Sequence, residues 1–178
     1  MSDILVVNAS PLIALAEIGY ERLLSALAKS VLVPTAVEAE ILAGPQGDPA
    51  RRLLEHGWAQ TVEPTIVPAQ VIEWGLGSGE SAVLAVALET PGSTAVLDDA
   101  AARTAARSLG VPVIGTLGLI VRAKQHQQLS SAATVIAQLK SAGLYLDDQL
   151  VRVVLQQIGE TWPPPAVPHL PPTSQGTP

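Results

Sequence analysis

Oxygen-bearing side chains recur where the apolar runs of this sequence end. They are Asn8 and Ser10 after ILVV, Glu40 in the helical segment after VLVP, Glu80 after GLGSG, and Asp98 with Asp99 after TAVL. Separate segments of the chain therefore contribute the acids. Oxygen ligands in such number suit a hard cation such as Mg²⁺ or Mn²⁺ better than they suit zinc.

Each of these residues also has an ordinary structural explanation. Asn8 and Ser10 could cap the helix that follows them, and Glu40 could be a solvated helix residue. Glu80 opens a helix, and the positive end of a helix dipole favours an acid. Taken together at the ends of strands, however, they favour a functional site.

Asp98 and Asp99 could likewise cap the helix that follows them. Asp99 also stands four residues before Arg103, which is the spacing of a surface ion pair on a helix. Adjacent acids after a strand suggest a receiver-like phosphoacceptor as another class of protein. That class is disfavoured because the pair follows a late strand and not the first one.

The elements that must position these residues follow from hydrophobic patterning. Short β-branched runs alternate with Ala/Leu-rich segments of helical length, which predicts a parallel sheet covered on both faces. We expect strands over 4–7, 31–33, 59–62, 94–97 and 113–114. We expect helices over 11–16, 20–28, 34–42, 51–55, 80–88, 100–109, 117–125, 132–142 and 148–158, with 80–88 buried nearly all round. In such a sheet, ligands gather at the carboxyl ends of the strands.

The composition excludes several classes of protein. The 178 residues include no Cys, so disulfide scaffolds, zinc–thiolate sites and cysteine nucleophiles are ruled out. With 10 Lys+Arg against 16 Asp+Glu, the net charge of −6 argues against simple electrostatic adhesion to nucleic acid or anionic membranes. Three Trp, two Tyr and no Phe provide no aromatic platform for stacking bases. Bound divalent cations could turn an acidic cluster into a clamp for phosphate.

The chain is expected to contain one domain over 1–160 and a proline-rich, disordered tail over 161–178. The apolar stretches are too short for a membrane span, and the N-terminus lacks the pattern of a secretory signal. We therefore expect a cytoplasmic protein that does not associate with membranes. The GTLG segment lacks the lysine and the spacing of a P-loop, so it predicts a tight strand-to-helix turn.

Four segments in order carry a resemblance to a known family. They are VVNASPLIALAEIG, VPTAVEAEI, GSGESAVLAVALE and VLDDAAARTAARSLGVPVIGTLGLIVRAKQ. This set resembles the PIN-domain superfamily, and within it a bacterial branch of small predicted nucleases found beside antitoxin genes. The resemblance covers 4–158 and implies a Rossmann-like three-layer α/β/α fold with a short, mostly parallel central sheet.

The resemblance also implies a metal-dependent ribonuclease site. The acid positions of the superfamily correspond to Asn8, Glu40, Glu80 and Asp98 in this chain, with Ser10 and Asp99 as supporting residues. Arg103 matches a basic position of this branch. Arg107, one turn further on, and Lys124 are candidates to contact the RNA backbone, although all three bases could equally be solubilising surface charge. The superfamily usually has Asp where this chain has Asn8. A neutral amide offers only one carbonyl oxygen, so cation binding should be weaker.

The function that the resemblance implies, carried by these residues, is a Mg²⁺- or Mn²⁺-dependent endoribonuclease that hydrolyses RNA phosphodiesters with water. The resemblance implies the toxin of a type II toxin–antitoxin pair, with RNA as substrate and a small antitoxin as partner, and a homodimer is also plausible for the superfamily. The alternative is a catalytically weakened PIN fold that acts by associating with protein or RNA.

Overall fold

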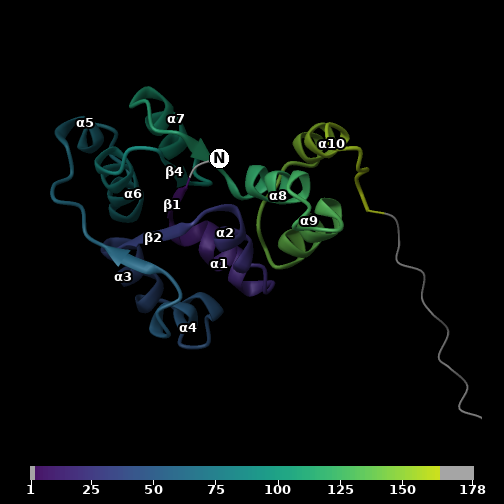
Figure 1. Cartoon of the computed structure of the whole chain (residues 1–178), viewed down its shortest axis with the longest axis horizontal. Helices are drawn as coiled ribbons and strands as arrows, with labels where there is room; N and C mark the ends of the chain where they lie inside the picture. Colours follow the sequence, from purple (N-terminus) through teal and green to yellow (C-terminus); the bar gives the residue numbers. More distant parts are fainter. Residues whose placement is uncertain (1–2, 165–178) are drawn as a thin grey trace, which may run out of the picture.

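The central sheet has five parallel strands in the order β3-β2-β1-β4-β5. The computed structural model describes residues 3–164 of the chain. The strands are β1 Ile4–Val7, β2 Ser30–Pro34, β3 Gln60–Val62, β4 Ser93–Val96 and β5 Val113–Ile114. Every expected strand is present. The three-layer α/β/α architecture is also confirmed, because helices cover both faces of the sheet (Figure 1).

The helices confirm the expected alternation. They are α1 Ala9–Glu17, α2 Arg22–Leu27, α3 Thr35–Ala43, α4 Pro49–Glu55, α5 Ala69–Ile72, α6 Ser78–Glu89, α7 Ala100–Ser108, α8 Thr116–Gln125, α9 Ala132–Ser141 and α10 Asp148–Gln156. Only α5 was not expected. It is a single turn with Pro68 at its N-cap and Glu73 at its C-cap, too short for an apolar periodicity to reveal.

Burial explains the residue types of the strands. The central strands β1 and β4 consist almost entirely of buried residues, because helices cover them on both faces. At one edge of the sheet, β3 exposes Gln60 and Thr61. Helix α6 packs against β1, β2 and β4, and its residues 82–87 are all buried. The prediction that this helix is buried nearly all round is therefore confirmed.

The connections reverse direction between β1 and β4. From β1 the chain moves outward to β2 and β3, and then crosses the sheet to β4 and β5 on the other side. Such a switch point leaves a crevice at the carboxyl ends of the two central strands. Asn8 follows β1 and Asp98 lies two residues beyond the end of β4, so the topology places them on either side of the crevice. The backbone N–H of Asn8 donates to the carbonyl of Val96 at 3.2 Å, which ties the two strand ends together.

No helix within residues 3–164 combines the length and the hydropathy needed to cross a bilayer. The disordered tail expected over 161–178 falls, from residue 165 onward, outside the described residues.

Ile120 and Ile72 allow a matched test of where the core lies. Ile120 in α8 is 0% exposed and Ile72 in α5 is 63% exposed. We expect Ile120→Ala to lower the free energy of unfolding by about 2–5 kcal/mol, because it leaves a cavity in close-packed surroundings. Ile72→Ala should change it by less than about 1 kcal/mol. Urea denaturation measures both, and equal losses would contradict the assignment of α8 to the core.

Candidate functional site

We call the edge of the sheet where β1 and β4 end, and where Asn8 and Asp98 lie, the polar edge. Asn8 is only 7% exposed there. It occupies the N-cap position of α1, but its side chain makes no capping hydrogen bond. The interpretation of Asn8 as a side-chain cap is therefore wrong. Its Oδ1 atom is buried and has no hydrogen-bond partner among the described residues. An unsatisfied buried acceptor costs free energy, so this oxygen is a position where a ligand would be favoured.

Gly79 shows what the Asn8 oxygen faces. A Cβ atom placed on Gly79, in the first turn of α6, would lie 3.2 Å from Asn8 Oδ1 and 2.8 Å from Glu40 Oε2. The two oxygens therefore both lie against Gly79, where a side chain would not fit. Both atoms are hydrogen-bond acceptors, so in this orientation of the Asn8 amide a donor or a cation that reaches both would satisfy them.

Glu40, on α3, also lines a cavity of about 430 Å³. Ser10, on α1, lines the same cavity, so the structure brings these two sequence candidates together. The rest of the wall comes from α1 and from the segment after α9: Ile13, Ala14, Glu17, Ala142, Gly143 and Leu144. Glu17 was missed from the sequence. Its spacing from Ser10 on a helix of 3.6 residues per turn could have indicated it, because residues seven apart share a face.

Glu80 has a structural task at the start of α6. Its Oε2 atom accepts a hydrogen bond from the backbone N–H of Gly77 at 3.2 Å, as in a capping box. The interpretation of Glu80 as a helix-start residue is confirmed, and its carboxylate is half-buried. To serve as a ligand, Glu80 would have to leave or share this hydrogen bond.

Asp98 is anchored to the first residue of α8. Its Oδ1 accepts from the Thr116 backbone N–H at 2.7 Å, and its Oδ2 accepts from Thr116 Oγ1 at 2.6 Å. Asp99 caps α7, because its Oδ1 accepts from the Ala102 N–H at 2.8 Å, as its spacing indicated. The ion pair expected between Asp99 and Arg103 is not among those formed within residues 3–164.

The donors at this edge fit a divalent cation in type, because all of them are carboxylate or amide oxygens. The orphaned Asn8 oxygen and the approach of Asn8 and Glu40 to the same glycine, Gly79, fit it in position. The described part of the chain nevertheless gathers no group of three acidic, His or Cys side chains that could hold a metal ion. Glu40, Glu80 and Asp98 thus do not form the ready carboxylate cluster that the sequence suggested, because Glu80 and Asp98 are held by hydrogen bonds elsewhere.

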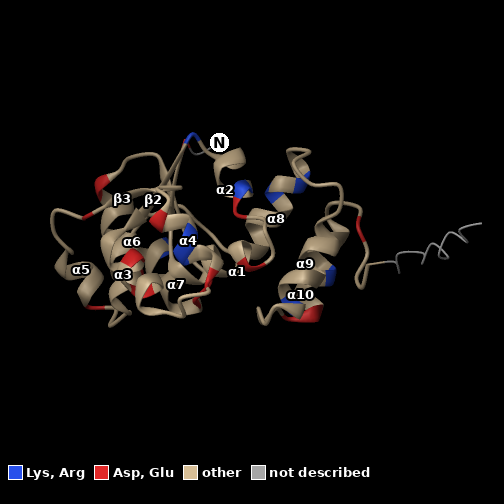
Figure 2. Cartoon of the chain, turned by 90° about the horizontal axis from the view of Figure 1, so that it is seen from below, with Lys and Arg blue, Asp and Glu red and all other residues tan. Residues whose placement is uncertain are grey.

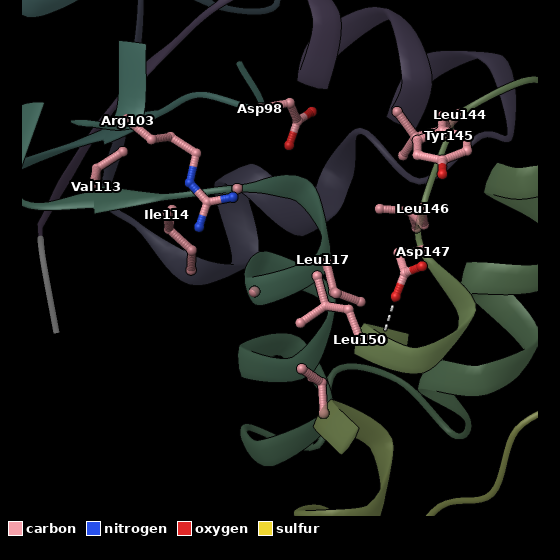
Figure 3. Close-up of a pocket in the computed structure, with 13 residues that line it drawn as sticks. Asp98, Arg103, Val113, Ile114, Leu117, Leu144, Tyr145, Leu146, Asp147 and Leu150 are labelled. Atoms are coloured by element: carbon pink, nitrogen blue, oxygen red, sulfur yellow. Dashed lines mark hydrogen bonds between the residues drawn. The ribbon is translucent and has the colours of Figure 1, made fainter. Parts of the chain in front are cut away.

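Of the basic candidates, Arg103 lies beside the acids. It lines a second cavity, of about 460 Å³, together with Asp98 (Figure 3). Arg107 is exposed one turn further along α7. Lys124 instead pairs with Glu160 at 3.1 Å and donates to the Ser130 carbonyl at 2.6 Å. Figure 2 shows the few Lys and Arg spread over several elements rather than gathered as one basic face.

Glu160, the ion-pair partner of Lys124, accepts hydrogen bonds from the backbone N–H groups at the N-terminus of α9. Burial alone would raise the pKa of its carboxyl group. The hydrogen bonds from the Ala133 and Ala132 backbone, with those from Lys124 and Ser131, outweigh burial and lower the pKa below the ordinary 4.5. Lys124 therefore has a structural role, because its ion pair with Glu160 helps to hold the C-terminal segment against α9.

A group with a depressed pKa in the folded state stabilises above its unfolded pKa, and this stability is lost as the pH falls through the folded pKa. We expect Glu160→Gln to lower the free energy of unfolding at neutral pH by about 1–3 kcal/mol. The difference from the wild type should shrink as the pH falls below 4.5. Urea denaturation at several pH values measures it, and a pH-independent difference would contradict the charged clamp.

A parallel sheet with helices on both faces and a polar crevice at its switch point defines a three-layer α/β protein. Residues 4–160 match the family model described as the PIN domain, and the chain belongs to the PIN-domain family. PIN domains generally use divalent metal ions. A comparison with curated proteins found no match to this chain.

Proposed function

We propose that this protein is an endoribonuclease that depends on Mg²⁺ or Mn²⁺. The observation that carries the proposal is the pair of acceptor oxygens, Asn8 Oδ1 and Glu40 Oε2, that both lie against Gly79, with the Asn8 oxygen buried and without a hydrogen-bond partner among the described residues. Asp98 stands on the other side of the same switch point. A divalent cation satisfies two acceptors at once, and PIN domains generally use divalent metals.

In this proposal Asn8 and Glu40 provide the first oxygens for the cation, and Glu80 and Asp98 provide further carboxylate charge. When bound, Mg²⁺ or Mn²⁺ would acidify a water molecule and neutralise charge on the phosphate. Ser10, exposed in the Glu40 cavity, would orient a phosphate oxygen through its hydroxyl. Asp99 would act indirectly, because it caps the helix that carries Arg103.

RNA as the substrate is supported by the charge arrangement around Asp98. With a net charge of −6, the protein offers little general attraction for a polyanion, so binding must rely on local positive charge. Arg103 supplies such charge in the Asp98 cavity, and Arg107 follows one turn later at the surface. Lys124 is the weakest of the three candidates, because Glu160 neutralises it.

The toxin role and a small antitoxin partner are supported by the resemblance of the four ordered segments to the antitoxin-linked branch. We place the antitoxin, in this proposal, over the polar edge, where it would keep RNA from the acids. A homodimer is compatible with the same proposal.

Asp98→Asn tests the catalytic assignment. The variant keeps the shape of the side chain and an oxygen for the Thr116 N–H, but it loses a negative charge. We expect Mn²⁺-dependent cleavage of a fluorescent single-stranded RNA to fall roughly 100-fold or more. Asp148→Asn makes the same chemical change on α10, where Asp148 pairs with Lys140 at 2.6 Å, and should leave the rate unchanged. Cleavage that survives chelation of the metal, or equal rates for both variants, would refute the proposal.

Asn8→Asp tests the cation position separately from catalysis. Without metal, a second carboxylate beside Glu40 should lower the free energy of unfolding by roughly 1–3 kcal/mol. With millimolar Mn²⁺, the added charge should tighten cation binding about tenfold or more and restore the stability. Calorimetric titration and thermal unfolding with and without Mn²⁺ measure both effects. A loss of stability that Mn²⁺ does not reverse would contradict the site.

A second candidate is a catalytically weakened PIN fold that only associates with RNA or protein. It is favoured by the amide at Asn8 and by the missing three-carboxylate group within residues 3–164. Turned about its Cβ–Cγ bond, the Asn8 amide would present its N–H to Glu40, which would satisfy both groups without a cation. Cation binding by Asn8→Asp but not by the wild type would select this candidate.

A further inference from the structure

The cavity beside Asp98 has two chemically different ends, and we call it the Arg103 pocket. It is lined by Asp98, Arg103, Val113, Ile114, Gly115, Leu117, Gly118, Leu144, Tyr145, Leu146, Asp147, Leu150 and Val154. Its volume of about 460 Å³ falls in the range of sites for small ligands. Figure 3 shows Arg103 on one side of the pocket and Asp147 on the opposite side, with Leu117 between them.

Arg103 is a cation that has no ion-pair partner within residues 3–164. Its Nε atom is buried and makes no hydrogen bond with any described residue. A partly buried guanidinium that lacks an acceptor is costly unless a ligand supplies one. The fork of N–H groups on arginine matches the oxygens of a phosphate.

Gly115 lets Arg103 and Asp98 pack close to the backbone at one end of the pocket. A Cβ atom at Gly115 would lie 3.3 Å from Arg103 Nη1 and 3.1 Å from Asp98 Oδ1, so a side chain there would crowd both groups. Both groups line the same pocket, so a ligand bound at the guanidinium lies near the carboxylate that we assign to catalysis. Leu144 lines both this pocket and the Glu40 cavity, so one extended ligand could run from one to the other.

The outer part of the pocket exposes apolar surface. Tyr145 is 87% exposed and Leu150 is 50% exposed, although both are large side chains that water solvates poorly. A flat ring placed against Tyr145 and the leucines would remove this surface from water. The composition suggested no aromatic platform, and a single Tyr is enough for one base but not for a row of stacked bases.

We propose that the Arg103 pocket binds one unpaired nucleotide of the RNA, with a phosphate at Arg103 and the base against Tyr145. A nucleotide carries both groups that the pocket is suited to bind, an anionic phosphate and a flat base. A base inside a double helix is stacked and paired, so only single-stranded RNA can place one here. The identification of RNA as the ligand rests on the proposed function. If it holds, the pocket makes the enzyme selective for single-stranded RNA.

Binding of mononucleotides in EDTA tests the pocket independently of cleavage. NMR titration follows the Nε–H signal of Arg103 and the backbone signals, with a nucleoside 3′-monophosphate compared with ribose 5-phosphate. We expect the nucleotide to bind about fivefold or more tightly than the sugar phosphate. Tyr145→Ala should abolish that difference, and Arg103→Gln should weaken both ligands about tenfold. Arg22→Gln, an exposed arginine on α2, should change neither.

Equal binding of the two ligands by the wild type, or nucleotide binding that Arg103→Gln leaves intact, would overturn the proposal. Binding of N-acetyl-leucine in place of the nucleotide would also overturn it and would indicate a peptide site. Tyr145 is largely exposed, so its variant should fold and keep the test valid. If the nucleotide binds here while the wild-type protein cleaves no RNA with Mn²⁺ present, the pocket stands and only the nuclease proposal fails.

Discussion

Parallel pairing holds the carboxyl ends of β1 and β4 side by side, and the candidate site depends on this contact. The backbone of Asn8 donates to Val96, so the first residue of the site is itself part of the pairing. Helices α1, α3, α7 and α8 all begin directly after strands, at the same edge of the sheet. Their positive dipole ends partly offset the repulsion among the acids that gather there.

Two glycines let polar side chains pack close together at this edge. Asn8 and Glu40 approach Gly79, and Asp98 and Arg103 approach Gly115, at distances that would crowd a side chain on either glycine. The first pair consists of two acceptors and suits a cation, whereas Arg103 in the second pair offers positive charge to a phosphate. The polar groups with structural tasks, Glu80 and Asp99, lie at helix starts. The same acids can therefore serve the fold and border the site.

The C-terminal third of the described chain completes the site from outside the sheet. Figure 1 shows α8, α9 and α10 grouped at one end of the molecule, and the segment after α9 brings Leu144 and Tyr145 to the edge of the crevice. Glu160 holds the end of this unit by binding the N-terminus of α9 and Lys124. Lys124, which the sequence suggested as an RNA contact, thus stabilises the packing of the unit that forms the pocket wall.

The sequence by itself determined the alternation of strands and helices, because uniformly apolar runs, proline and glycine act over a few residues. It also determined that Asn8 and Asp98 follow strands, and therefore that they share an edge once the strands are parallel. Only the tertiary structure decided which oxygens face each other. The approach of Asn8 and Glu40 to Gly79 depends on how α3 packs against α6, and the position of Tyr145 in the same pocket as Arg103 depends on where the C-terminal helices dock. Such contacts join residues far apart in the chain, and no local pattern encodes the distance between them.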